Sequence, residues 1–167
     1  MIRLRDSILM LLAAFFTVSC APIDTVSLTK DTTLIALRHA DRDAGVDELN
    51  ATGLIRAEAL PVELSGYEID AIFSPGFHRN IQTATPLANA TGLAIRNVPE
   101  FTMPEQLDAL PAGHSAVWIG NKENLTLLWE RINAPGEPPL KYGELHIVHF
   151  DGAGHAAIQV LQFGPNE

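Results

Sequence analysis

Short apolar runs alternate along the chain with longer segments of helical spacing. The strand-like runs are continuous, which is typical of parallel strands buried on both faces. Alternation of this kind predicts an α/β fold whose mainly parallel sheet has flanking helices. We expect strands at residues 34–37, 69–73, 93–98 and 116–120, and helices at residues 54–64, 80–90 and 121–132.

Polar and special residues set the ends of these helices. Asn50 or Thr52 can cap the first helix, Pro61 is expected to interrupt or kink it, and Gly66 and Gly92 are stop signals. Residues 99–113 hold prolines and acids without a clear period, so we expect a long excursion there.

The last part of the chain has a strand pattern of a different kind. Residues 145–150 and 156–163 alternate around Asp151-Gly152-Ala153-Gly154, which is the signature of a β-hairpin. We therefore expect an antiparallel C-terminal hairpin to close the sheet.

The first nineteen residues indicate a secretory signal peptide. Arg3 and Arg5 precede the apolar run 8–16, which is too short to span a bilayer, and small residues follow. We expect a signal peptide at residues 1–19, a polar tether at 20–32 and one domain at 33–167.

Cys20 is the only cysteine, so no intrachain disulfide can form. Its position resembles a bacterial lipoprotein processing site, with Ser19 in keeping with that pattern and Thr17 where a leucine is usual. We expect acylation of Cys20 and a periplasm-facing lipoprotein in the cell envelope. The alternative is cleavage after Ala21, which would give a soluble periplasmic protein.

The charge of the chain limits which classes of molecule it can bind. The chain has 11 basic and 20 acidic residues, and a chain starting at Cys20 keeps 9 and 19 of them. Because no basic cluster is present, nucleic acid is excluded as a partner. A composition of 47% hydrophobic and 19% charged residues is that of a globular domain, and a small anionic ligand fits it better.

The run at residues 34–37 leads directly into Arg38 and His39. Ligands of open α/β sheets bind beyond the carboxyl ends of such strands, so this pair lies where a site is expected. We interpret His39 as a nucleophile for phosphoryl groups and Arg38 as a phosphate-binding residue.

Four blocks in order resemble the histidine phosphatase superfamily, in its short phosphoglycerate mutase-like or SixA-like branch. They are Arg38-His39-Ala40-Asp41, the block 49–57 that ends in Arg56-Ala57, the block 74–84 with Ser74-Pro75, Arg79 and Gln82-Thr83-Ala84, and the closing hairpin 145–164. The resemblance implies a phosphatase that hydrolyses small phosphomonoesters through a phosphohistidine on His39. It also implies Arg79 as a second phosphate-binding residue, with no cofactor and no metal.

The two arginines have a second expected effect. Their positive charges disfavour protonation of His39, so we expect a lowered imidazole pKa. The forked donors of Arg38 and Arg79 would clamp the phosphate oxygens.

One position departs from the family pattern. The second histidine of the family is replaced by Asn121, which keeps a hydrogen-bond donor for phosphate but no charge. Loss of one such donor elsewhere costs about a hundredfold to a thousandfold in rate. The alternative function is therefore an impaired member that binds a phosphorylated envelope ligand.

The general acid is expected among the carboxylates near the site, and Glu100 is our choice. The other candidates are Glu105, Asp108 and Asp41. No other histidine is expected to replace the missing one: His114 lies at the wrong end of its strand, and His78 is expected in solvent. We expect exposed strand histidines at 146, 149 and 155, with a metal site at 149 and 155 as the alternative.

Overall fold

The structure is a computed structural model that describes residues 23–165. The expected signal peptide and Cys20 therefore lie outside the described residues. The elements are β1 (Asp31–Arg38), α1 (Ala51–Glu63), β2 (Ala71–Ser74), α2 (His78–Thr91), β3 (Ile95–Asn97), α3 (Met103–Asp108), β4 (His114–Gly120), α4 (Lys122–Arg131), β5 (Glu144–Asp151) and β6 (Ala156–Gln162). Within the described residues, no helix combines the length and apolarity needed to cross a membrane.

The strands form one sheet in the order β3-β2-β4-β1-β5-β6. β1, β2, β3 and β4 pair in parallel, whereas β5 is antiparallel to both of its neighbours. The mainly parallel sheet and the antiparallel C-terminal hairpin are both confirmed.

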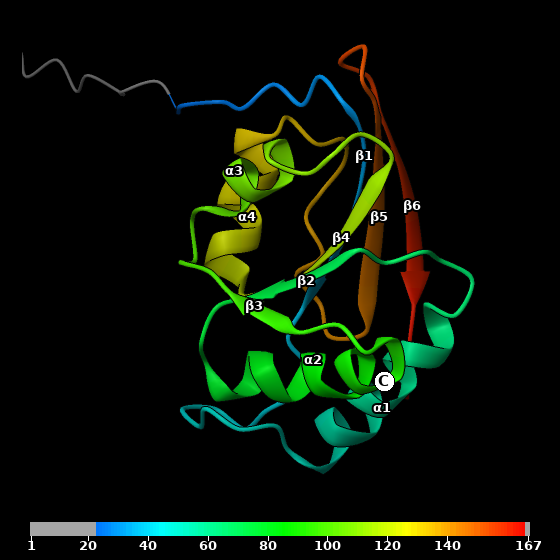
Figure 1. Ribbon diagram of the computed structural model, residues 1–167. Coiled ribbons are helices and arrows are strands. Elements are labelled where there is room, and N and C mark those ends of the chain that lie inside the picture. Colours follow the sequence, from blue (N-terminus) through cyan, green and yellow to red (C-terminus); the bar gives the residue numbers. More distant parts are fainter. Residues whose placement is uncertain (1–22, 166–167) are drawn as a thin grey trace, which may run out of the picture.

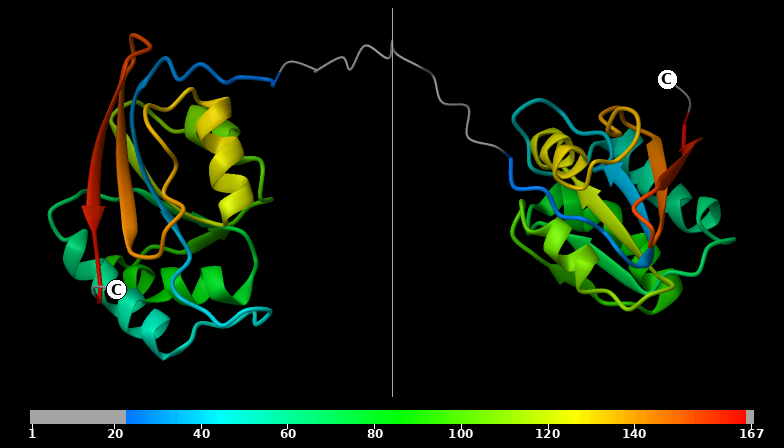
Figure 2. Two further views of the ribbon diagram at one scale, coloured as in Figure 1. Left: turned by 180° about the vertical axis from the view of Figure 1, so that it is seen from behind. Right: turned by 90° about the horizontal axis from the view of Figure 1, so that it is seen from above.

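Helices cover both faces of the sheet (Figures 1 and 2). α1 and α2 pack together on one face, and α3 and α4 cover the other. Along β1, Leu34 and Ala36 join the core under α3 and α4, while Ile35 and Leu37 join the core under α1 and α2. All four side chains are fully buried, which explains the continuous apolar run of this strand.

β1 begins three residues earlier than the apolar run indicates. Residues ahead of it also contact the domain, since Leu28 is buried and the Val26 N–H donates to the Arg131 carbonyl at 2.7 Å. The described end of the expected tether 20–32 is thus partly bound to the domain. The mostly polar sequence of this segment gave no sign of the contact, because the Val26 hydrogen bond is made by the backbone.

Asn50 caps α1, and its side chain accepts the Gly53 N–H at 3.0 Å. A Cβ on Gly53 would lie 2.1 Å from the Asp41 carbonyl oxygen, so only glycine lets the helix approach the segment after β1. Contrary to expectation, Pro61 does not interrupt α1, which continues to Glu63. Proline there costs one hydrogen bond close to the helix end, where few bonds remain to be lost.

The excursion at residues 99–113 contains an element that the sequence pattern did not indicate. α3 is a six-residue helix, held against the core by Met103 and Leu107, which are both buried. So short a helix is stabilised by packing and gives no readable period.

Candidate active site

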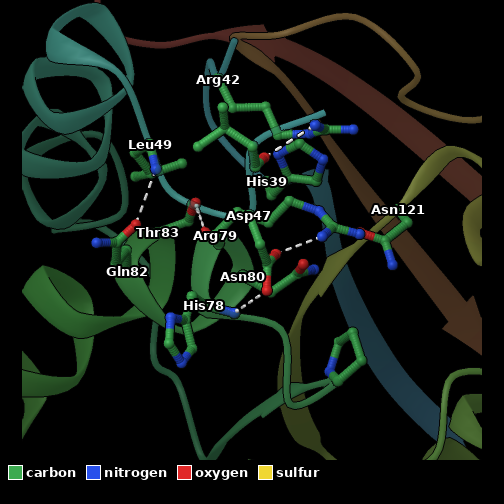
Figure 3. Close-up of polar contacts among 12 residues, drawn as sticks. His39, Arg42, Asp47, Leu49, His78, Arg79, Asn80, Gln82, Thr83 and Asn121 are labelled. Atoms are coloured by element: carbon green, nitrogen blue, oxygen red, sulfur yellow. Dashed lines mark hydrogen bonds and ion pairs between the residues drawn. The ribbon is translucent and has the colours of Figure 1, made fainter. Parts of the chain in front are cut away.

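The carboxyl ends of β1 and β4 lie side by side and bring together residues far apart in the sequence. Arg38 pairs with Gly120 in the parallel register, and the His39 N–H donates to the Gly120 carbonyl at 2.9 Å. His39 and Asn121 therefore follow adjacent strand ends. Arg79, in the first turn of α2, extends its guanidinium between them (Figure 3).

The imidazole of His39 has a defined hydrogen-bond arrangement. Its Nδ1 lies 2.8 Å from the Ala40 carbonyl oxygen, which can only accept a hydrogen bond. In the neutral ring Nδ1 therefore carries the proton, and Nε2 keeps its lone pair. The backbone of the next residue thus leaves the Nε2 lone pair of the neutral ring available.

The pKa of His39 is lowered from 6.5 to about 4. Burial is the larger cause, because the residue is only 2% exposed, and the charges of Arg38, Arg79 and Arg42 lower it further. The bond to Ala40 acts in the opposite direction. The sequence correctly predicted a lowered pKa but attributed it to the two arginines alone, because burial cannot be read from a dipeptide.

Arg38 is held by the connection between α4 and β5. Its guanidinium donates to the Leu140 carbonyl at 3.2 Å and to the Tyr142 hydroxyl at 3.0 Å, and it stacks 4.0 Å from the centre of the Tyr142 ring. Burial lowers the pKa of Arg38, but a guanidinium stays charged at neutral pH. Tyr142 also lies against His39, with ring centres 5.8 Å apart. The sequence gave no signal for Tyr142.

Arg79 contacts the side chains of three residues. One terminal nitrogen donates to Asn121 Oδ1 at 3.2 Å, the other donates to the carboxylate of Asp47, and the guanidinium lies over the Phe77 ring. Its Nε is buried without a partner. The structure thus brings together the predicted phosphate-binding residues Arg79 and Asn121 beside His39.

Two side chains of α2 fix Arg79 relative to the segment that carries His39. Thr83 Oγ1 accepts the Ala40 N–H at 2.9 Å and donates to the Arg79 carbonyl at 2.7 Å. Asn80 donates to the Ile119 carbonyl at 2.8 Å, which joins α2 to the end of β4. Thr83 belongs to a block that the sequence singled out, but its bridging role emerges only in three dimensions.

Asp47 and Arg42 are site residues that the sequence missed. Asp47 lies in the loop before α1 and also accepts the His78 N–H at 3.2 Å. Its slight burial raises its pKa, but the bonds from His78 and Arg79 outweigh this and lower it overall. Arg42 donates to the Asp43 and Val46 carbonyls and so shapes the same loop. A lone aspartate in a polar loop gives no sequence signal for such a contact.

Glu100 is the candidate acid that contacts Asn121. One of its oxygens, Oε2, accepts from Asn121 Nδ2 at 3.2 Å and from Asn124 Nδ2 at 3.4 Å. Asn124 also accepts the Asn121 N–H at 2.8 Å. These contacts tie Glu100 to the start of α4.

The other three candidate acids lie elsewhere. Asp41 is bound to the buried Arg56 at 2.6 Å, and Glu105 pairs with Arg131. Asp108 is exposed at the end of α3.

The remaining histidines lie outside the site or at its margin. His114 is at the amino end of β4 beside Asp70, and His78 is exposed, both as expected. His149 and His155 are exposed, but the prediction for His146 is wrong because it is 6% exposed and packs edge-on against Trp129. β5 lies inside the sheet, so its side chains under α4 are covered. Residues 23–165 contain no group of three side chains placed to bind a metal ion.

A cavity at the other end of β1 offers no comparable chemistry. It measures about 570 Å³ and is lined by residues 25–28, 132–135, Phe150, Gly154 and Ala156, none of which has an ionisable side chain. By contrast, the positive charges of Arg38, Arg79 and Arg42 lie near His39.

Known proteins share both part of the sequence and the fold. Residues 34–102 match the model of the histidine phosphatase superfamily, branch 1. The protein histidine phosphatase SixA, solved with tungstate, is 21% identical with a TM-score of 0.63, and the match covers 78% of this chain and 96% of that one.

Two further solved structures have the same fold. A SixA protein from Agrobacterium tumefaciens is 20% identical with a TM-score of 0.59, covering 81% of this chain and 99% of that chain. A mycobacterial glucosyl-3-phosphoglycerate phosphatase, solved with inorganic phosphate, is 15% identical with a TM-score of 0.61, covering 80% and 97%. No curated protein matches the chain. The chain is thus similar to the histidine phosphatase superfamily over residues 34–102, and it shares the fold of these solved phosphatases.

Proposed function

We propose that the domain hydrolyses small phosphomonoesters through a phosphohistidine on His39. The observation that carries this proposal is the neutral imidazole itself. Its Nδ1 is bonded to Ala40, its pKa is about 4, and Arg38 and Arg79 lie near it. A nucleophile that stays unprotonated beside two guanidinium groups suits attack on an anionic phosphoryl group.

The proposed reaction has two steps. In the first, Nε2 of His39 attacks phosphorus, the bond from phosphorus to the leaving oxygen breaks, and that oxygen takes a proton from the Glu100 carboxyl group. In the second, water attacks the phosphohistidine and gives its proton to Glu100, and the P–N bond breaks to release phosphate. Arg38 and Arg79 stabilise the charge on the phosphoryl oxygens in both steps.

Two structural relatives support an oxyanion as the ligand. SixA was solved with tungstate and the mycobacterial phosphatase with inorganic phosphate. Both ions are tetrahedral oxyanions, and guanidinium pairs bind such ions through forked hydrogen bonds. We propose that the same site of this chain takes the phosphoryl group of a small phosphorylated compound.

Asn121 motivates a second candidate function, binding of a phosphorylated envelope ligand without turnover. Its amide is already bonded to Arg79 and Glu100, and it has no charge to offer a transferring phosphoryl group. A site of this kind would retain anion binding through the arginines while chemistry slows.

One assay series separates the two candidates. Hydrolysis of p-nitrophenyl phosphate and binding of inorganic phosphate are measured for the wild type, His39→Ala and Asn121→His. Asn89→Ala, on the exposed face of α2, is the control. Turnover that His39→Ala abolishes supports the enzyme. Phosphate binding without turnover, with turnover gained in Asn121→His, supports the binder. The proposal fails if His39→Ala changes neither hydrolysis nor phosphate binding.

We also propose that the chain is exported and anchored through an acylated Cys20. The basic start, the apolar run 8–16 and the single cysteine support this. Intact-mass measurement of membrane-extracted protein should show the mass of a diacyl or triacyl cysteine at the N-terminus. A soluble protein that begins at Pro22 would contradict the anchor.

A further inference from the structure

Asn121 is held in a fixed position by burial and by hydrogen bonds of its backbone. It is 4% exposed and lies between β4 and α4. Its N–H donates to Asn124 Oδ1 at 2.8 Å, and its carbonyl accepts the Leu125 N–H at 2.9 Å. Gly120, just before it, accepts the backbone N–H of His39. The position of the amide is therefore fixed relative to the nucleophile.

Both ends of this amide are used, and they face groups of opposite charge. Oδ1 accepts from the Arg79 guanidinium at 3.2 Å, while Nδ2 donates to Glu100 Oε2 at 3.2 Å. Within residues 23–165, Arg79 and Glu100 form no direct ion pair with each other. The neutral amide is a spacer between them.

A neutral spacer has a physical advantage at this point. A direct contact between Arg79 and Glu100 would neutralise the guanidinium that is needed for phosphate and would hold the carboxylate in its ionised form. The amide instead keeps the two groups apart, so that the guanidinium stays free for phosphate and the carboxyl group can take up and release a proton. An acceptor and a donor on one planar side chain are available only from asparagine or glutamine among uncharged acyclic residues.

Glu100 is also left with one oxygen for chemistry. Asn121 and Asn124 both donate to Oε2, and no group in the described part of the chain donates to Oε1. The two amides thus fix the carboxyl group through one oxygen. The proton exchanged with a leaving group would be carried on the other.

From this geometry we infer that Asn121 is a positioning residue that aligns Arg79 and Glu100 on the same phosphoryl group. It acts through those two side chains. The role rests on the proposed function of His39 and Glu100, and it gives the asparagine a task different from that of the family histidine.

A double-mutant cycle between positions 121 and 100 tests this role. The wild type, Asn121→Ala, Glu100→Gln and the double variant are assayed on p-nitrophenyl phosphate and on an alkyl phosphate. The alkyl leaving group needs a proton and the nitrophenolate does not. Asn121→Ala should lower kcat for the alkyl ester about tenfold more than for the aryl ester, and this difference should shrink to less than about twofold in Glu100→Gln.

Calorimetry also measures the binding of inorganic phosphate to the same four variants. If Asn121 holds Glu100 beside the anion, Glu100→Gln should tighten phosphate binding about threefold to tenfold because a like charge is removed. In the Asn121→Ala background the same change should have less than about a twofold effect. Asn89→Ala, on the exposed face of α2, is the control for loss of an amide.

The two readings separate failure of this inference from failure of the proposed function. Absence of any turnover that depends on His39 would refute the enzyme, while the binding cycle would still report coupling between positions 121 and 100. Equal effects of Asn121→Ala on both esters and in both backgrounds, with no coupling in phosphate binding, would overturn the positioning role.

Discussion

Two arginine–aspartate pairs lie near the carboxyl end of β1, and their surroundings differ sharply. In the pair of Arg56 and Asp41 the side chains are 3% and 13% exposed, whereas in the pair of Arg79 and Asp47 they are 15% and 47% exposed. The first pair is largely buried, with Arg56 almost fully so. The second opens toward solvent beside His39.

The hydrogen bonds of the buried pair are saturated. Arg56 donates twice to Asp41 and also to the carbonyls of Phe163 and Pro165, which joins α1 to the end of the chain. A Cβ at Gly143 or Gly164 would lie within 3 Å of the Arg56 side chain, so both glycines make room for it. All three guanidinium nitrogens of Arg56 donate to acceptors within the fold, which is the pattern of a structural ion pair.

The partners of Arg79 are fewer and more easily displaced. Asp47 lies on a loop, Asn121 is neutral, and the Nε of Arg79 is buried without an acceptor. A phosphate could take over hydrogen bonds that Asp47 now accepts, because both are anions of similar reach. The comparison shows that the number and rigidity of partners, rather than residue type, separate a structural arginine from a ligand-binding one.

The largest expected effect on activity follows from removal of Arg79, the arginine of the more exposed pair. Arg79→Met should lower kcat/KM for p-nitrophenyl phosphate by about a hundredfold to a thousandfold, because one charged donor to the transition state is lost. Its free energy of unfolding should change by less than about 1 kcal/mol, as for an exposed ion pair. Arg96→Met, at an exposed position of β3, is the control. Equal losses of kcat/KM in both variants would show that Arg79 does not contribute to phosphate hydrolysis.

The buried pair should respond in the opposite way. Arg56→Met should reduce the free energy of unfolding by about 3 kcal/mol or more, since it leaves Asp41 buried without its cation. Urea denaturation measures this change. The folded fraction should keep its phosphate affinity within about threefold. A stable Arg56→Met protein with weak phosphate binding would reverse the assignment of the two pairs.

The pH dependence of His39 tests the electrostatic side of the comparison. With its pKa near 4, against 6.5 for the unperturbed group, His39 should be neutral from pH 8 to 5 and protonate only as the pH falls toward 4. The folded-state pKa is lower than that of the unfolded chain. The free energy of unfolding should therefore decline as the pH falls from about 6.5 to about 4. NMR titration of the His39 ring measures the value. The urea-unfolded chain is the reference, and titration near 6.5 in the folded protein would contradict the burial argument.

The smallest expected effect concerns the carboxylate that now contacts Arg79. Asp47→Asn should tighten binding of inorganic phosphate about threefold, because a negative charge beside the anion is removed. Asp43→Asn is a matched control, because Asp43 lies in the same loop but contacts Asn50. Calorimetry of both variants decides the sign. Weaker binding in Asp47→Asn would mean that Asp47 positions Arg79 and does not compete with phosphate.

The sequence predicted local features that depend on periodicity and capping. The four parallel strands, the stop at Gly92, the closing hairpin and the choice of Asn50 or Thr52 as cap follow from residue patterns a few positions long, and the structure has Asn50 as the cap. α3 and the buried position of His146 did not follow, because packing by distant residues determines both. Pro61 was misjudged for a related reason: its cost depends on how many helix bonds lie beyond it.

The sequence by itself determined which residues could form a phosphate site: an arginine and a histidine at a strand end, a second arginine, and an asparagine in place of a histidine. Only the tertiary structure decided how they are used. Burial lowers the pKa of His39, Ala40 selects its free nitrogen, and the amide of Asn121 separates Arg79 from Glu100. These properties arise from contacts across adjacent strand ends and α2, which no short stretch of sequence contains.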